Sequence, residues 1–165
     1  MRKLLVMSFV AAVLVACGAA KTGGEKNVAS QRLYEQVVDS LSRGTYTVLF
    51  DYVYPQRMSP RFLSPTYSLR VSGDSIESYL PYFGVAYRAD IGNERESPLV
   101  FRSHAYDYQV VRTRKEAYAV SFKAKRGMEM LEYRLDIFPN GKADLLVLST
   151  DRESIRFTGE LDLND

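Results

Sequence analysis

Through most of the chain after Thr45, apolar and polar side chains alternate at every second position. A strand turns successive side chains to opposite faces, so this alternation is typical of an antiparallel sheet with one buried and one solvated face. The pattern predicts about eight such strands. The apolar sets of three of them are Tyr46, Val48, Phe50, Tyr52 and Tyr54; Tyr118, Val120, Phe122 and Ala124; and Ile155, Phe157, Leu161 and Leu163.

The Asn140–Gly141 pair predicts a hairpin with a two-residue type I′ turn, because both central residues of that turn need a positive φ. The resulting register pairs Leu135 with Leu146 and Tyr133 with Leu148. Leu145 and Val147 then point to the other face. Either the N-terminal helix covers them, or they form part of an outer contact surface.

A second turn is predicted at Gly73–Asp74, which suits type II′. Its register pairs Val71 with Ile76 and Arg70 with Glu77. An aliphatic pair on one face and an ion pair on the other are typical of a sheet with one wet face.

One helix precedes the strands. Leu33, Val37 and Leu41 recur at intervals of four, as on the buried face of an amphipathic helix. We expect Ser30 or Asn27 to cap its start and Gly44 to end it. These elements predict a mainly β domain of the α+β class, with the helix packed on a curled antiparallel sheet that forms a half-barrel or a sandwich.

The N-terminus has the order of a secretory signal: two cations, Arg2 and Lys3, then a largely apolar run over residues 4–16, then Cys17. The run is shorter than the roughly 20 residues that span a bilayer. The end of the run, Leu-Val-Ala-Cys17, resembles the lipobox of bacterial lipoproteins, in which the cysteine receives a diacylglyceryl group. We therefore predict a signal peptide over residues 1–16, a flexible tether over 17–27 and one β-rich domain over 28–165.

Cys17 is the single cysteine of the chain, so the expected mature domain has no thiol for disulfides, metals or nucleophilic catalysis. Removal of Arg2 and Lys3 with the signal turns 22 basic against 20 acidic residues into 20 against 20. The mild basicity therefore belongs to the signal and does not support nucleic-acid binding.

Three motifs carry a resemblance to a known family: Asp51-Tyr-Val-Tyr-Pro55, the stretch from Tyr67 to Gly84, and Phe138-Pro-Asn-Gly141. Together they resemble an uncharacterised family of Bacteroidetes lipoproteins, domain of unknown function 4251, from about the helix to the C-terminus. The resemblance implies an envelope protein and brings no activity, cofactor or catalytic residue. The tether has no acidic run such as marks surface-exported lipoproteins of that phylum, so the analogy favours the periplasmic side of the outer membrane.

The segment from Tyr79 to Tyr87 is the first candidate site. Pro81 cannot donate to a central ladder, so the strand bends or runs along an edge there. The four aromatic residues proposed as ligand contacts are Tyr79, Tyr82, Phe83 and Tyr87. They either line a pocket mouth for a ligand or pack over one end of the sheet.

A basic hairpin is the second candidate. Its cations, proposed to touch anionic headgroups or phosphates, are Arg112, Arg114, Lys115, Lys123 and Lys125. Lysines on an exposed strand also discourage aggregation, so a purely protective role stays open.

Catalytic and metal sites find little support. His104 is the sole histidine, and no Gly-x-Ser-x-Gly elbow accompanies it. The oxygen-rich loop with Asp90, Asn93, Glu94 and Glu96 does not have the spacing of a calcium loop. We expect no catalytic residue, no metal and no cofactor.

These observations favour a lipid-anchored, non-catalytic domain that binds an apolar or amphipathic small molecule or a lipid. The alternative is a scaffold protein that docks another envelope component through an exposed sheet face or the basic hairpin. The expected partners are the membrane, through lipid on Cys17, and such a ligand or protein; nucleic acid is not expected.

Overall fold

The computed structural model describes residues 22–88, 97–114 and 116–163, with side chains from Val28 onward. The described residues from Leu33 onward form a compact unit of their own, which holds every strand described. The elements are α1 (Thr22–Arg43), β1 (Thr45–Tyr54), β2 (Arg61–Phe62), β3 (Ser68–Ser72), β4 (Ser75–Tyr79), β5 (Val100–Arg112), β6 (Tyr118–Arg126), β7 (Glu129–Ile137), β8 (Lys142–Ser149) and β9 (Ile155–Asp162).

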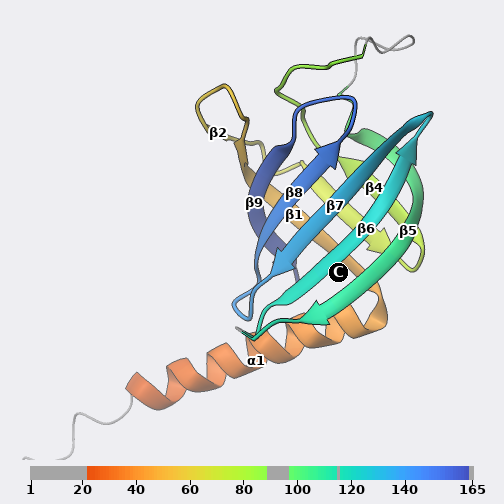
Figure 1. Cartoon of the computed structure of the whole chain (residues 1–165). Coiled ribbons are helices and arrows are strands. Elements are labelled where there is room, and N and C mark those ends of the chain that lie inside the picture. Colours follow the sequence, from red (N-terminus) through yellow and green to blue (C-terminus); the bar gives the residue numbers. More distant parts are fainter. Residues whose placement is uncertain (1–21, 89–96, 115, 164–165) are drawn as a thin grey trace, which may run out of the picture. The chain divides into compact units, whose positions relative to one another are not determined.

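The strands form a closed antiparallel barrel (Figure 1). From β3 to β9 each strand pairs with the next, and β1 pairs with both β3 and β9. Of the nine strands, the two-residue β2 alone lies outside the ring, paired with the end of β1. This confirms the predicted mainly β class with one helix and about eight strands. The predicted curl goes to completion, which removes the free edges of an open sheet.

A glycine permits the close approach of the two strands at the seam. Gly159 of β9 pairs with Phe50 of β1, and a Cβ at Gly159 would collide with the carbonyl oxygen of Leu49. A residue with a side chain would push the two strands apart at the step that closes the ring.

A bulge in β1 reverses the alternation of its side chains. The register against β9 shifts at Asp51. Beyond it Val53 is fully buried, whereas Tyr54 is exposed. The prediction that Tyr52 and Tyr54 share the inner face with Val48 is therefore wrong, because one extra residue moves every following side chain to the opposite face.

The β7–β8 hairpin differs by one residue from its predicted register. Leu135 pairs with Leu145 and Tyr133 with Val147. Leu145 and Val147 consequently point into the barrel, where 0% and 3% of their surface is exposed. The outer contact surface considered for these two residues is therefore wrong.

The loop of this hairpin explains the error. The N–H of Gly141 donates to the carbonyl of Phe138 at 2.9 Å, which puts Pro139 and Asn140 at the centre of the turn. Gly141 follows with φ of 76°. This is a three-residue loop with a glycine bulge, which uses one residue more than the predicted type I′ turn.

The β3–β4 hairpin has the predicted register, with Val71 opposite Ile76 and Arg70 opposite Glu77. The aliphatic pair is buried. On the wet face the carboxylate of Glu77 accepts a hydrogen bond of 2.7 Å from Arg102 of β5, so its ion pair is made with the next strand rather than with Arg70.

Aromatic and aliphatic side chains pack the barrel interior. The Phe122 and Tyr133 rings stack with centroids 5.0 Å apart. The Tyr133 hydroxyl donates to Ser78 Oγ at 3.1 Å, and Ser78 donates to the Leu99 carbonyl at 2.7 Å, so both of these buried hydroxyls are hydrogen-bonded. The largest fully buried side chains are Tyr46, Tyr133, Phe50, Phe122, Phe157, Leu69, Ile76, Leu80, Leu99, Leu131, Leu135 and Ile137. Small barrels are filled in this way.

From Leu33 onward, α1 lies across one end of the barrel (Figure 1). Val37 and Leu41 join the core, with 0% and 8% exposure. Gly44 ends the helix with φ of 66°, and its N–H donates to the Leu41 carbonyl at 3.1 Å, as predicted.

The start of the helix differs from the prediction. It begins at Thr22, so residues 22–27 of the predicted tether are helical, and Asn27 and Ser30 lie inside it rather than at its cap. The segment contains no proline, and each of its two glycines costs a helix only about 1 kcal/mol. Within the described residues, no helix has the length and apolar character that crossing a membrane requires.

Candidate functional site

Residues 80–88 cover the end of the barrel that lies opposite the helix (Figure 1). Leu80 is fully buried, and the Tyr82 hydroxyl donates to the Glu153 carbonyl at 2.9 Å. Ala86 forms a β-bridge with Arg152. These contacts hold the segment on the β8–β9 loop. They favour a covering role over that of a pocket mouth.

The four aromatic residues proposed as ligand contacts have different neighbours. The centroid distances are 5.6 Å from Tyr79 to the Tyr67 ring, 5.0 Å from Phe83 to the Arg61 guanidinium and 5.3 Å from Tyr82 to the Arg152 guanidinium. Tyr87 is 62% exposed. Ligand binding by these four residues stays a prediction.

Beneath this segment lies a buried ion pair that sequence reasoning missed. Arg152 donates from Nε to Glu129 Oε1 at 2.7 Å and from Nη2 to Oε2 at 2.6 Å. Both side chains are 7% exposed. Ser149 donates to the same carboxylate at 2.7 Å, and Arg126 Nη1 lies 3.9 Å from it. Such a bidentate pair is strong because its geometry matches the carboxylate.

A second buried carboxylate extends the network. Glu153 is 3% exposed, and its side chain accepts hydrogen bonds from Arg57 Nε and, at 3.1 Å, from the backbone N–H of Val85. Its partners come from loops far apart in the sequence. No local spacing therefore points to the network.

Burial opposes ionisation of Glu129, but the hydrogen bonds from Arg152 and Ser149 outweigh it, so the pKa of Glu129 lies below its ordinary value of 4.5. Burial raises the pKa of Tyr82 to about 12. The carboxylates of Glu129 and Glu153 are both paired with arginines. The network therefore holds residues 80–88 in place, and neither carboxylate is available to act as a general base.

The basic hairpin is divided in the structure. The Arg112 guanidinium lies 3.4 Å from the Glu116 carboxylate and over the ring of Tyr34 in α1. Lys123 bonds Asp107 at 2.8 Å, and Lys125 lies over Tyr106. Arg112 pairs with Tyr118, so Lys123 follows five positions further along β6, roughly 16 Å away. Arg114 is exposed, and Lys115 lies outside the described residues. Contact of the five cations with an anionic surface stays a prediction.

His104 lies on the outer face of β5, with its side chain 69% exposed and Nδ1 3.4 Å from an Asp74 carboxylate oxygen. The loop with Asp90, Asn93, Glu94 and Glu96 lies outside the described residues. Within the parts of the chain that the structure describes, no three His, Cys, Asp or Glu residues gather to hold a metal.

The reversed half of β1 creates an aromatic face on the outside of the barrel, formed by Tyr52, Tyr54 and Phe62. The Tyr52 ring contacts Tyr54 and Phe62 at centroid distances of 5.1 Å and 4.6 Å. Phe62 is 86% exposed. Arg156 of β9 lies over Tyr54 and pairs with Asp144. The sequence pattern misses this face because it assigns both tyrosines to the core.

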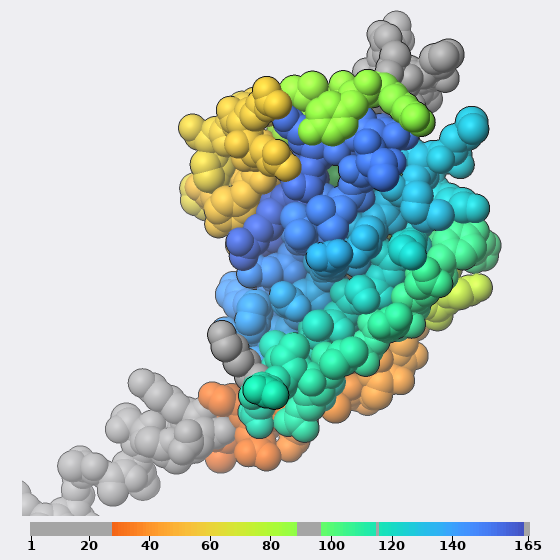
Figure 2. All heavy atoms as spheres, viewed as in Figure 1, coloured from red at the N-terminus to blue at the C-terminus, as the bar shows by residue number. Residues whose placement is uncertain are grey.

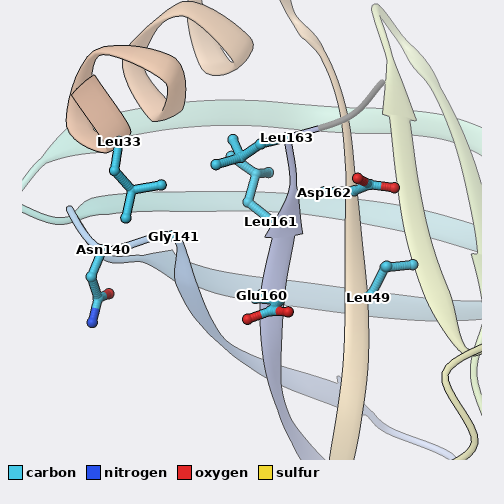
Figure 3. A pocket seen from close by; sticks show the side chains of 8 residues that line it. All are labelled: Leu33, Leu49, Asn140, Gly141, Glu160, Leu161, Asp162 and Leu163. Carbon is cyan, nitrogen blue, oxygen red and sulfur yellow. The ribbon is translucent and has the colours of Figure 1, made fainter. Parts of the chain in front are cut away.

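A groove of about 350 Å³ lies where α1 approaches β9 (Figure 3). We call it the leucine groove. The side chain of Leu33 points from the helix toward Leu161 and Leu163, while Leu49 lines the β1 side. The remaining lining residues are Asn140, Gly141, Glu160 and Asp162. Figure 2 shows one face of the whole molecule, with β2 and its flanking loops projecting beside β9.

Residues 29–161 match the family described as domain of unknown function (DUF4251). A crystal structure of a DUF4251 family protein from Bacteroides eggerthii has the same fold, with a TM-score of 0.59 and 12% identity over 81% of this chain and 89% of that one. No curated protein matches. The chain therefore belongs to the DUF4251 family.

Proposed function

We propose that this protein is an envelope lipoprotein whose barrel docks another envelope protein through the aromatic face of Tyr52, Tyr54 and Phe62. The observation that carries the proposal is the exposure of Phe62, 86%, within a set of three rings in which Tyr52 contacts both of the others. Exposed aromatic clusters cost solubility, and they are enriched where proteins bind one another. An arginine beside the rings adds a residue type common in binding hot spots.

The rigidity of the aromatic face also supports docking. All three rings project from paired strands rather than from loops, so little conformational entropy is lost when a partner binds. Tyr54 is held under Arg156, which is itself bonded to Asp144 at 2.6 Å.

The barrel interior favours docking over binding of a ligand inside the sheet. Its largest buried residues are aromatic and aliphatic side chains in mutual contact. Binding of a small amphipathic ligand is therefore proposed only for the surface of the barrel.

Anchoring completes the proposal. Lipid on Cys17 would hold the domain at the outer membrane, on its periplasmic side. Replacement Cys17→Ser should abolish incorporation of a labelled fatty acid and release the protein from the membrane fraction. Unchanged labelling and sedimentation would contradict anchoring through this cysteine.

Photo-crosslinking tests the docking surface. A photoreactive residue in place of Thr158, the β9 residue that pairs with Tyr52 of β1, reports contacts beside the aromatic face and replaces none of its three rings. In cells producing the full chain we expect one dominant adduct, identified by mass spectrometry. It should disappear in the Phe62→Ser variant and persist in Val111→Ser, which changes an exposed apolar residue of β5. A diffuse ladder, or an adduct indifferent to Phe62→Ser, would rule out this face.

A further inference from the structure

The leucine groove combines an aliphatic floor with an acidic rim. Leu161 is buried, and Leu33, Leu49 and Leu163 are half-buried, so the floor keeps part of its apolar surface in water. Leu33 Cδ1 approaches the Asn140–Gly141 turn, which forms one wall. A volume of about 350 Å³ lies at the lower end of the range for small-molecule sites.

The charges of the groove have one sign. Of the lining residues that the structure describes, Glu160 and Asp162 carry carboxylates and none carries a cation. Lys142, which is not among the lining residues, bonds Glu160 at 2.9 Å and also interacts with Asp51, and Asp162 has an interaction of its own. The local balance is therefore acidic, although the mature chain as a whole has equal numbers of acidic and basic residues.

We propose that the leucine groove binds a cationic amphiphile, with an alkyl chain on the leucines and an ammonium group against Glu160 and Asp162. Each methylene that the leucines bury strengthens binding about fourfold, so the leucines supply most of the affinity. The carboxylates select the head group, because they attract an ammonium and repel a carboxylate or phosphate. The groove thus discriminates against fatty acids and anionic phospholipids. This site is independent of the aromatic face and of any protein partner.

Three ligands with the same chain and different head groups test the proposal: octylammonium, octanol and octanoate, each below its micelle concentration. The full chain carrying Cys17→Ser is titrated and followed by amide NMR. We expect saturable shifts at Leu33, Gly141 and Leu163. Octylammonium should bind about two- to fivefold tighter than octanol, the effect of a solvent-exposed ion pair, and octanoate weaker than octanol.

Matched variants separate the two parts of the site. Glu160→Gln removes a carboxylate and frees Lys142, so the preference for octylammonium over octanoate should fall about two- to fivefold. Leu33→Ser on the helix should weaken all three ligands alike. Leu146→Ser, a half-buried leucine on the outer face of β8, should change none of them.

Three results would overturn the proposal: octanoate binding as tightly as octylammonium, shifts that spread over the surface without saturation, or no shift with any ligand. None of them bears on docking through the aromatic face, because the titration contains no partner protein. Loss of the Thr158 crosslink would in turn leave the groove titration unaffected.

Discussion

Aliphatic side chains close the helix end of the barrel, whereas paired charges hold the covering segment at the opposite end. At the helix end Val37 and Leu41 enter the core. At the other end the bidentate pair of Arg152 and Glu129, together with Glu153, lies beneath residues 80–88. Both ends exclude water from the same interior.

The difference predicts two kinds of sensitivity. At the helix end, the stability gained from packing apolar side chains depends on how well they fill the available volume and hardly at all on pH or salt. At the opposite end, the stability gained from the ion pairs depends on each charge keeping its partner, because a buried charge without a partner bears the full cost of desolvation. The two ends should therefore respond differently to substitutions and to pH.

The largest effect is expected from Arg152→Ala. It leaves the Glu129 carboxylate buried with less compensation, which costs about 3–5 kcal/mol of unfolding free energy. Urea denaturation followed by circular dichroism measures it. The double variant Arg152→Met Glu129→Leu should recover most of the loss, since no buried charge remains.

The matched control for this prediction is Arg156→Ala. Its pair with Asp144 has the same length, 2.6 Å, but the arginine side chain is 55% exposed, so the cost should be at most about 1 kcal/mol. An equal loss in both arginine variants would show that burial does not distinguish the two pairs.

A smaller loss is expected at the helix end from Leu41→Ala. Removing this side chain from the core costs about 2–5 kcal/mol, at the lower part of that range because Leu41 retains 8% exposure. Denaturation at low and high salt measures it, and the loss should not change with salt. A loss that changes with salt would contradict the conclusion that apolar contacts alone hold the helix end of the barrel.

The third prediction concerns acid. The pKa of Glu129 is lower in the folded state than its ordinary value of 4.5, so its stabilising contribution is complete well above that pH and is lost as the pH falls toward the folded pKa. The difference in unfolding free energy between wild type and Glu129→Gln should shrink as the pH is lowered from 7 toward 3. The difference between wild type and Leu41→Ala should stay constant. A difference for Glu129→Gln that does not depend on pH would show that its carboxylate is not held ionised by Arg152.

Local patterns in the sequence predict the helix end better than the opposite end. The spacing of Leu33, Val37 and Leu41 identifies the buried face of the helix, and Gly44 identifies its end. Each of these residues lies about one helical turn from the next. Period-two alternation likewise predicts the inner faces of β6 and β9.

The opposite end depends on contacts between residues distant in sequence. Glu129 and Arg152 stand 23 positions apart, and Arg57 and Glu153 stand 96 apart. The aromatic face was missed for a related reason, because the bulge at Asp51 forms only when β1 pairs with β9. A single residue inserted in a ladder changes no composition or propensity, yet it moves Tyr52 and Tyr54 from core to surface.

The smallest effect is expected from Tyr82→Phe, which removes one hydroxyl from the covering segment. Its hydrogen bond to the Glu153 carbonyl contributes about 0.5–1.5 kcal/mol. The pKa of Tyr82 is raised to about 12, so the folded state favours the neutral phenol; this contribution is complete below pH 10 and declines as the pH rises toward 12. Denaturation at pH 8 and pH 11 should therefore show a smaller difference between wild type and Tyr82→Phe at the higher pH. Tyr79→Phe, on an exposed ring stacked against Tyr67, serves as the control and should cost less than Tyr82→Phe at pH 8. Because residues 80–88 rest on the ionic network through this hydroxyl, an equal response of the two variants would mean that the segment is held by its apolar contacts, as the helix end is.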